Sequence, residues 1–118
     1  MVYSVITTPQ FEKDVSFYLK KKRYMKIVID INELVDELQK GNLVGDEIPR
    51  LRLPDQENVF KVRVANTSIN AGKSNGFRVI YYVVKNDKEI YLLTVYSKKD
   101  NENISDKEII GLIRLYCV

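Results

Sequence analysis

Apolar residues either alternate with polar ones or run together in three stretches of the second half of the chain. These stretches cover residues 59–65, 77–85 and 89–96, and each is rich in Val, Ile, Tyr and Phe. Such residues fit a pleated, half-buried surface, so the pattern predicts three β-strands. Asn86 and Asp87 predict a two-residue hairpin turn between the last two, because both residue types tolerate positive φ. Weaker alternation over residues 2–7 predicts a first, short strand.

Three other stretches repeat their apolar residues with the period of a helix. Thr8 and Pro9 predict the start of the first helix, with Thr8 as N-cap and Pro9 at the first helical position. A second helix is predicted over residues 25–40. Its apolar stripe consists of Ile27, Ile31, Leu34 and Leu38. Ser105 and Glu108 match the S-x-x-E capping box that opens a last helix.

The predicted order of elements is β-α-α-β-β-β-α in one domain over residues 1–118. It predicts an α+β fold: a small twisted antiparallel sheet with an N-terminal helical hairpin and a C-terminal helix packed on it. Residues 42–58 are expected to form a connection without regular structure. Residues 66–76 form a long polar loop between two strands, and loops of this length suggest a function.

The charges are distributed unevenly along the chain. Residues 60–99 contain eight basic and two acidic side chains, whereas the rest of the chain contains 11 basic and 14 acidic ones. The formal net charge of +3 is therefore the sum of +6 on residues 60–99 and −3 on the rest of the chain. The eight basic residues are Lys61, Arg63, Lys73, Arg78, Lys85, Lys88, Lys98 and Lys99.

Two features of the composition exclude whole classes of chemistry. The chain has no histidine, which excludes histidine triads, two-histidine metal motifs and histidine acid–base pairs. Cys117 is the one cysteine, so an internal disulfide and a cysteine-based metal cluster are excluded. We expect no metal and no cofactor, and the single cysteine favours a reducing cytoplasmic location. No signal peptide and no apolar run long enough to span a bilayer are seen, so no membrane association is expected.

Strand alternation indicates which basic residues converge. In the strand 59–65, Lys61 and Arg63 point away from the apolar side chains and so share the open face of the sheet. Arg78 interrupts an otherwise apolar run, with Ile80 and Tyr82 on the same face. Clustered cations there favour a bound polyanion, nucleic acid by default. The alternatives are charges that protect a strand from aggregation, or a structural Arg78 that pairs with Glu89.

The sequence Gly72-Lys73-Ser74 invites comparison with a phosphate-binding loop. That motif requires a glycine at position 67, where this chain has Thr67, and a helix after the loop, where a strand is predicted. We therefore reject nucleoside triphosphate binding, while Lys73 remains a candidate contact to phosphate.

Three strings extend these patterns to a known family: FKVRVAN (60–66), GKSNGFRVIYY (72–82) and IYLLTVYSKKD (90–100). They resemble the RelE/HigB superfamily of bacterial toxins. The HigB-like branch, with its strings GKSGGxRVIYY and YSKxD, is the most similar, and Asn75 replaces a common glycine. The resemblance implies a RelE/ParE-like fold and the toxin of a type II toxin–antitoxin system, an endoribonuclease that cuts mRNA in the ribosomal A site. The implied partners are the ribosome, mRNA and a cognate antitoxin, often a helix-turn-helix protein encoded next door.

The resemblance also implies roles for individual residues. Lys61 and Arg63 match the paired basic residues of the strand before the loop, and Arg78 matches the arginine after the glycine. Relatives add a catalytic His or Tyr near the C-terminus; this chain has Ile104 there, which leaves Tyr96 and Tyr116 as substitutes. The catalytic candidates are Lys61, Arg63, Arg78, Tyr96 and Lys98. The candidate RNA contacts are Lys73, Lys85 and Lys99.

The chemistry expected of such a site is metal-independent attack of the 2′-OH on the adjacent phosphate. Arg63 and Arg78 are suited to stabilise the negative charge that develops on the phosphorane. Either Lys61 or Lys98 could serve as the base that takes the proton of the 2′-OH. Two rival functions use the same fold. One is a gyrase poison of the ParE type, and the other is a weakly catalytic member that acts as an antitoxin-binding module.

Overall fold

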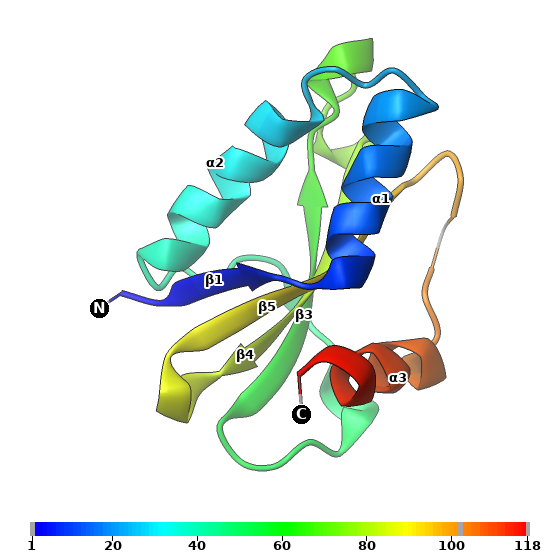
Figure 1. Ribbon diagram of the computed structural model, residues 1–118. Helices are drawn as coiled ribbons and strands as arrows, with labels where there is room; N and C mark the ends of the chain where they lie inside the picture. Colours follow the sequence, from blue (N-terminus) through cyan, green and yellow to red (C-terminus); the bar gives the residue numbers. More distant parts are fainter. Residues whose placement is uncertain (1, 102, 118) are drawn as a thin grey trace.

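The chain begins with one strand and a helical hairpin, and then forms the rest of a sheet. The computed structural model describes residues 2–101 and 103–117 (Figure 1). The elements follow in the order β1 (Ser4–Thr7), α1 (Pro9–Lys20), α2 (Ile27–Gln39), β2 (Asp46–Glu47), β3 (Glu57–Val64), β4 (Phe77–Val84), β5 (Glu89–Ser97) and α3 (Asp106–Tyr116). The predicted α+β fold is confirmed.

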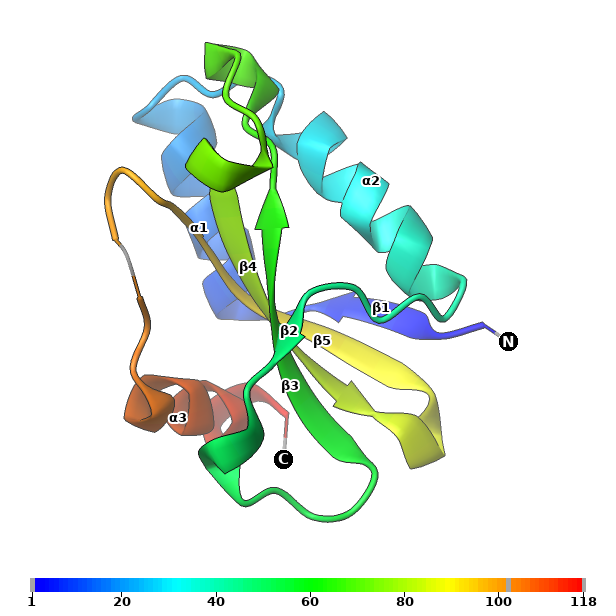
Figure 2. The same cartoon turned by 180° about the vertical axis from the view of Figure 1, so that it is seen from behind.

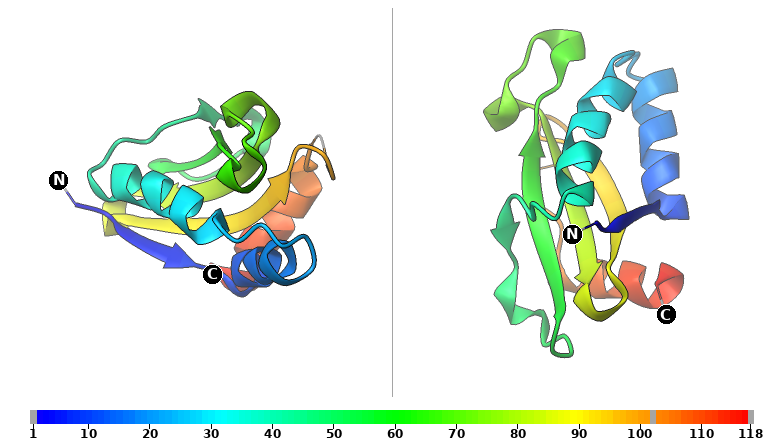
Figure 3. Two further views of the ribbon diagram at one scale, coloured as in Figure 1. Left: turned by 90° about the horizontal axis from the view of Figure 1, so that it is seen from above. Right: turned by 90° about the vertical axis from the view of Figure 1, so that its left-hand side faces the viewer.

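Across the described residues the strands form a five-stranded sheet in the order β1-β5-β4-β3-β2. The pairs β5–β4, β4–β3 and β3–β2 are antiparallel, while β1 runs parallel to β5. The helical hairpin between β1 and β3 allows this parallel pairing, because a parallel neighbour needs a long crossover connection. Figure 3 shows the twist of the sheet from two sides.

Both predicted helix starts are present, because each cap satisfies backbone N–H groups that the first turn leaves unpaired. The Thr8 hydroxyl accepts a hydrogen bond from the Phe11 N–H at 3.3 Å, and Pro9 occupies the first turn. The Glu108 N–H donates to the Ser105 hydroxyl at 3.1 Å in a complete capping box. In the part of the chain that the structure describes, no helix has the length and apolarity to cross a membrane.

Helices cover both faces of the sheet, so the protein has two apolar cores (Figure 1). The hairpin-side core lies between α1, α2 and one sheet face, and includes Phe11, Tyr18, Leu34, Leu38, Val62, Val79, Tyr81 and Leu92. The α3-side core lies on the opposite face, and includes Leu51, Val59, Ile80, Tyr82, Leu93, Ile109 and Ile113. The predicted open face is therefore partly covered by α3, near the beginning of β3.

Two local predictions were wrong. The connection between β4 and β5 is a four-residue turn, in which Lys85–Asp87 form a short 3-10 helix and Lys88 takes the positive φ of 53°. The segment 42–58 contains β2, which pairs with β3, and a 3-10 helix at Pro49–Leu51. Leu51 is buried in the α3-side core and holds this segment against the body.

The edge of β5 that faces α1 forms hydrogen bonds with the side chains of Thr8 and of two residues of α1. The Thr8 hydroxyl donates to the Leu92 carbonyl at 2.9 Å. Further along, the Asp14 carboxylate accepts from the Val95 N–H at 3.3 Å, and the Tyr18 hydroxyl accepts from the Ser97 N–H at 2.8 Å. The bonds from the Val95 and Ser97 N–H groups satisfy donors on the part of the β5 edge that β1 does not cover. They also fix the end of β5, from which Tyr96 and Lys98 project.

We expect Gly76→Ala to lower the free energy of unfolding by about 3 kcal/mol, because backbone crowds that position. An added Cβ would lie 2.2 Å from the Val64 carbonyl oxygen and 2.8 Å from the Asn66 nitrogen. Gly72→Ala is the matched control in the same loop, since its Cβ would meet nothing within 4 Å. Chemical denaturation of both variants checks this, and equal stability of the two would contradict it.

Candidate functional site

Three neighbouring strands bring Arg63, Arg78 and Tyr96 into one row. Arg63 of β3 lies opposite Arg78 of β4, and Arg78 lies opposite Tyr96 of β5. Side chains at paired positions of adjacent antiparallel strands are neighbours on the same face. The row crosses the end of the sheet from which the 66–76 loop leaves, while α3 covers the other end of the same face (Figure 2).

Lys61 extends this row into a cluster. It lies two residues before Arg63 on β3, so it projects from the same face. Burial lowers the pKa of Lys61, and the positive charges of Arg78 and Arg63 lower it further, whereas Asp46 opposes them. A lowered pKa makes the neutral amine more abundant, which is the form that can accept a proton. We refer to Lys61, Arg63 and Arg78 as the cationic cluster.

Arg78 is the buried member of the cationic cluster, with 6% of its surface exposed. Its Nη1 donates to the carbonyls of Lys73 at 3.1 Å and Phe77 at 3.2 Å, and its Nη2 donates to the carbonyl of Ser74 at 3.0 Å. Among residues 2–101 and 103–117 it forms no ion pair with a carboxylate. No described carboxylate therefore compensates its charge, and its guanidinium anchors the 66–76 loop.

The alternative pairing of Arg78 with Glu89 is absent. Glu89 lies at the opposite end of β5, where it pairs with Val84. Its carboxylate accepts a hydrogen bond from the Tyr91 hydroxyl at 2.9 Å. Arg78 thus has a structural role, but one directed to the carbonyls of the loop. We therefore expect the removal of Arg78 to weaken the fold.

A β-bulge places Tyr96 in the row. The register between β4 and β5 shifts between Ile80 and Tyr81, so that Ile80 pairs with Thr94 and Tyr81 with Leu92. The extra residue changes which face the following side chains occupy. Leu92 consequently lies in the hairpin-side core, while Tyr96 lies on the α3 side. Without the bulge the two would share a face.

The Tyr96 hydroxyl is shielded and unpaired. Tyr96 is 5% exposed, and its hydroxyl has no hydrogen-bond partner among the described residues. Burial raises the pKa of Tyr96, and the charge of Arg78 acts in the opposite direction. The hydroxyl is therefore protonated at neutral pH and able to donate a hydrogen bond.

Lys98 and Lys99 follow directly after β5, and both are exposed. The Lys98 N–H donates to the Gly76 carbonyl at 3.0 Å, which places Lys98 beside the residue that precedes β4. The Lys99 N–H donates to the Ser97 hydroxyl at 3.2 Å. The two lysines thus lie at the same end of the sheet as Arg78.

The 66–76 loop is tied down at both ends. The buried Asp30 carboxylate of α2 accepts from the Thr67 N–H at 3.0 Å and from the Thr67 hydroxyl at 2.8 Å. Arg78 holds the other end through the carbonyls of Lys73 and Ser74. The Lys73 side chain is exposed, and it lines a depression of about 260 Å³ together with Arg63. A strand follows this loop, in agreement with the rejection of a phosphate-binding loop.

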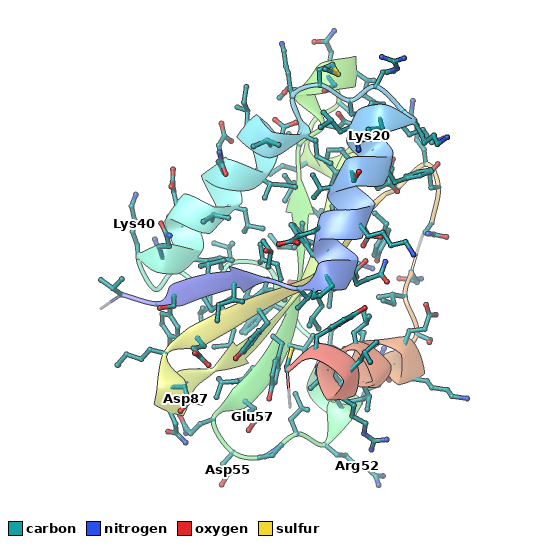
Figure 4. All side chains as sticks on the ribbon, viewed as in Figure 1. Lys20, Lys40, Arg52, Asp55, Glu57 and Asp87 are labelled. Carbon is teal, nitrogen blue, oxygen red and sulfur yellow. The ribbon has the colours of Figure 1, made fainter. Side chains whose placement is uncertain are left out.

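Lys85 lies away from the other candidates. It begins the turn after β4, seven residues beyond Arg78, a distance of roughly 23 Å along a strand. Figure 4 labels Asp87 in this turn and Glu57 at the start of β3, which mark that far end of the sheet. We do not include Lys85 in the site. Tyr116, near the end of α3, is half-buried and outside the row.

A cavity of about 430 Å³ borders the row on the side of α1. Tyr96 and Asn103 are part of its lining, which also includes the carboxylates of Asp14, Asp100 and Glu108. These acidic groups disfavour a phosphate there. The three positive charges of the cationic cluster would instead favour a phosphate.

One contact of the cluster was not predicted from the sequence. The Lys61 Nζ donates a hydrogen bond to the Asn103 Oδ1 at 2.8 Å. Asn103 belongs to a polar stretch between β5 and α3 that has no periodic pattern. Nothing in the sequence places this residue beside a strand 42 positions earlier.

No family model and no curated protein matches the sequence. Among solved structures, the chain is similar to E. coli toxin RelE in the free state, determined as a double arginine-to-alanine mutant. The two share 17% sequence identity over 86% of this chain and 90% of that chain, with a TM-score of 0.43.

Proposed function

We propose that this protein is a toxin of the RelE/HigB type and cleaves mRNA on the ribosome without a metal ion. The observation that carries the proposal is the cationic cluster, with a buried arginine that no described carboxylate neutralises. Burying this unpaired charge lowers the stability of the fold, since buried cations are normally paired with an anion. A bound phosphate supplies the missing negative charge.

The residues that carry the resemblance to this family converge in space. The string 72–82 contains Arg78 and the loop carbonyls that it holds, and the string 90–100 contains Tyr96 and Lys98. The Lys98–Gly76 hydrogen bond joins the two strings directly. Residues of the third string, Lys61 and Arg63, complete the cluster. Convergence of three separate strings at one site supports a common function for them.

In the proposed reaction the neutral amine of Lys61 takes the proton of the ribose 2′-OH. The 2′ oxygen then forms a bond to the adjacent phosphorus, and the bond from phosphorus to the 5′ oxygen breaks. Arg63 and Arg78 stabilise the negative charge on the pentacoordinate phosphorane, because guanidinium groups hold phosphate oxygens and stay charged. Lys98, an exposed cation beside the row, gives a proton to the 5′ oxygen. The products are a 2′,3′-cyclic phosphate and a 5′-hydroxyl.

Tyr96 has a supporting role in this scheme. Its hydroxyl is shielded from solvent, which favours Lys98 over Tyr96 as the proton donor. Tyr96 instead lies beside Arg78, whose guanidinium is held by the loop carbonyls. Lys73 and Lys99 contribute exposed positive charge for the RNA backbone.

The partners follow from the same proposal. They are the ribosome with its mRNA, and a cognate antitoxin, a helix-turn-helix protein encoded by the neighbouring gene. The protein would act in the cytoplasm, without membrane association.

Cleavage of mRNA is expected to depend on ribosomes. The net charge of +6 between residues 60 and 99 is small, and binding of free RNA through a few phosphates is weak and sensitive to salt. The ribosome would hold the mRNA in position at the site, and a misplaced reacting group alone lowers the rate about 100-fold. We therefore expect naked mRNA to be cut about 100-fold more slowly than mRNA on programmed ribosomes.

The measurement compares cleavage rates of one labelled mRNA with and without ribosomes that hold it in the A site. Equal rates in both conditions would contradict ribosome dependence. A DNA supercoiling reaction with gyrase, run in parallel, tests the ParE-type alternative. Antitoxin binding without cleavage in either condition would identify the protein as a binding module.

A further inference from the structure

The loop between β5 and α3, residues 98–105, runs beside the cationic cluster and is described except at residue 102. It is fastened at its start by the Lys98–Gly76 hydrogen bond and by an ion pair between Lys22 and Asp100 at 3.4 Å. Near its end, Ile104 packs on the α3-side core. The hydrogen bond from Lys61 Nζ to Asn103 Oδ1 connects this loop to the cluster itself.

We propose that Asn103 is a positioning residue for Lys61, with its amide oxygen orienting the Lys61 amine to accept the proton of the ribose 2′-OH. The inference rests on the proposed function, because it assigns a task to Lys61 within that reaction. It concerns one contact between two named atoms, Nζ and Oδ1, and no other residue of the loop is required.

The hydrogen bond restricts the direction of the lone pair on the amine. A lysine side chain is flexible, and its amino group otherwise rotates freely. A neutral amine has two hydrogens and one lone pair. When Asn103 Oδ1 holds one hydrogen, rotation about the last carbon–nitrogen bond is limited, and the lone pair keeps to a restricted set of directions. Such orientation of a reacting group raises the rate of proton transfer.

The amide also orients Lys61 without adding charge. Among the residues that the structure describes, the charged groups that act on Lys61 are Arg63 on its own strand, Arg78 on β4 and Asp46 on β2. The two arginines favour the neutral amine, and Asp46 favours the ammonium. A carboxylate at position 103 would add a second negative charge at hydrogen-bond distance and favour the ammonium form, which cannot act as a base. An amide accepts the same hydrogen bond and leaves this balance unchanged.

The substitutions Asn103→Asp, Asn103→Ala and Asn103→Gln separate orientation from charge. Asn103→Asp keeps the acceptor and adds a negative charge, so the pKa of Lys61 should rise and the pH–rate profile should move to higher pH. At neutral pH the cleavage rate on ribosomes should fall about tenfold, and it should recover at high pH. Asn103→Ala removes the acceptor and should lower kcat about tenfold, without recovery at high pH.

Two further variants complete the design. Asn103→Gln restores an amide acceptor and should recover part of the rate lost in Asn103→Ala. Asn86→Asp makes the same change of charge in the exposed turn between β4 and β5, at the far end of the sheet, and should leave rate and profile unchanged. Thermal unfolding of every variant measures any loss of stability separately.

Isotope-edited NMR titration of the Lys61 side chain provides a readout that does not depend on cleavage. A raised pKa of Lys61 in Asn103→Asp, together with the shifted profile, supports the proposal. Unchanged pKa and unchanged profile in Asn103→Asp overturn it, as does a loss of rate that follows thermal stability alone. If the wild type cleaves no mRNA, the proposed function fails, whereas the titration still decides whether Asn103 contacts the Lys61 amine.

Discussion

Lys61→Met is expected to lower the rate of mRNA cleavage on ribosomes by about 1000-fold, the middle of the range for loss of a positioned general base. Methionine has a similar length and retains the apolar contacts of the lysine stem, but it cannot accept a proton. Stability should stay the same or rise slightly, because the substitution removes a cation that lies near Arg63 and Arg78.

The pH dependence gives this prediction a second readout. Lys61 acts as a base only when neutral, so the rate of the wild type should rise with pH until the pKa of Lys61 is passed. That midpoint should lie below the ordinary lysine value, because burial and the two arginines lower the pKa. In Lys61→Met this rise should disappear. Lys85→Met, at the far end of the sheet, is the matched control and should keep both the rate and the profile.

Arg78→Ala is expected to reduce cleavage by about 100-fold and also to destabilise the fold. A loss of this size is typical when one strong contact to the negative charge of the transition state is removed. The destabilisation, about 2 kcal/mol, arises because the carbonyls of Lys73 and Ser74 lose their donor and the 66–76 loop loses an anchor. Cleavage is therefore compared per folded molecule, at a temperature well below the unfolding transition of the variant.

Arg78→Lys distinguishes the two contributions. Lysine retains the positive charge, but it lacks the fork that reaches two loop carbonyls and two phosphate oxygens at once. We expect it to recover stability only in part and to remain well below the wild type in cleavage. A destabilised Arg78→Ala variant with wild-type activity per folded molecule would show that Arg78 serves the structure alone.

The helices and strands of this fold could be predicted from the sequence because their caps and apolar patterns involve residues close together in the chain. Thr8 and Pro9 define the start of α1, and Ser105 and Glu108 define the start of α3, through side chains within one helical turn. The alternation in β3 likewise places Lys61 and Arg63 on one face, since strand geometry requires it.

The remaining features depend on contacts between distant parts of the chain. The bulge opposite Ile80 turns Tyr96 toward the cationic cluster. No residue type in β5 indicates a bulge at this position. The burial of Arg78 depends on carbonyls of a loop without a pattern. The contact between Asn103 and Lys61 requires the 98–105 loop to fold back along the sheet. The turn at 85–88 differs from the predicted one because Lys88, instead of Asn86 or Asp87, adopts positive φ.

The chemical nature of the new RNA ends tests the proposed reaction most directly. Purified protein is added to ribosomes programmed with a labelled mRNA, and the termini of the fragments are identified. We predict a cut within the A-site codon that leaves a 2′,3′-cyclic phosphate and a 5′-hydroxyl, with the yield strongly reduced for Lys61→Met. An intact mRNA, fragments with a 3′-hydroxyl and a 5′-phosphate, or equal cleavage by Lys61→Met would contradict the proposal.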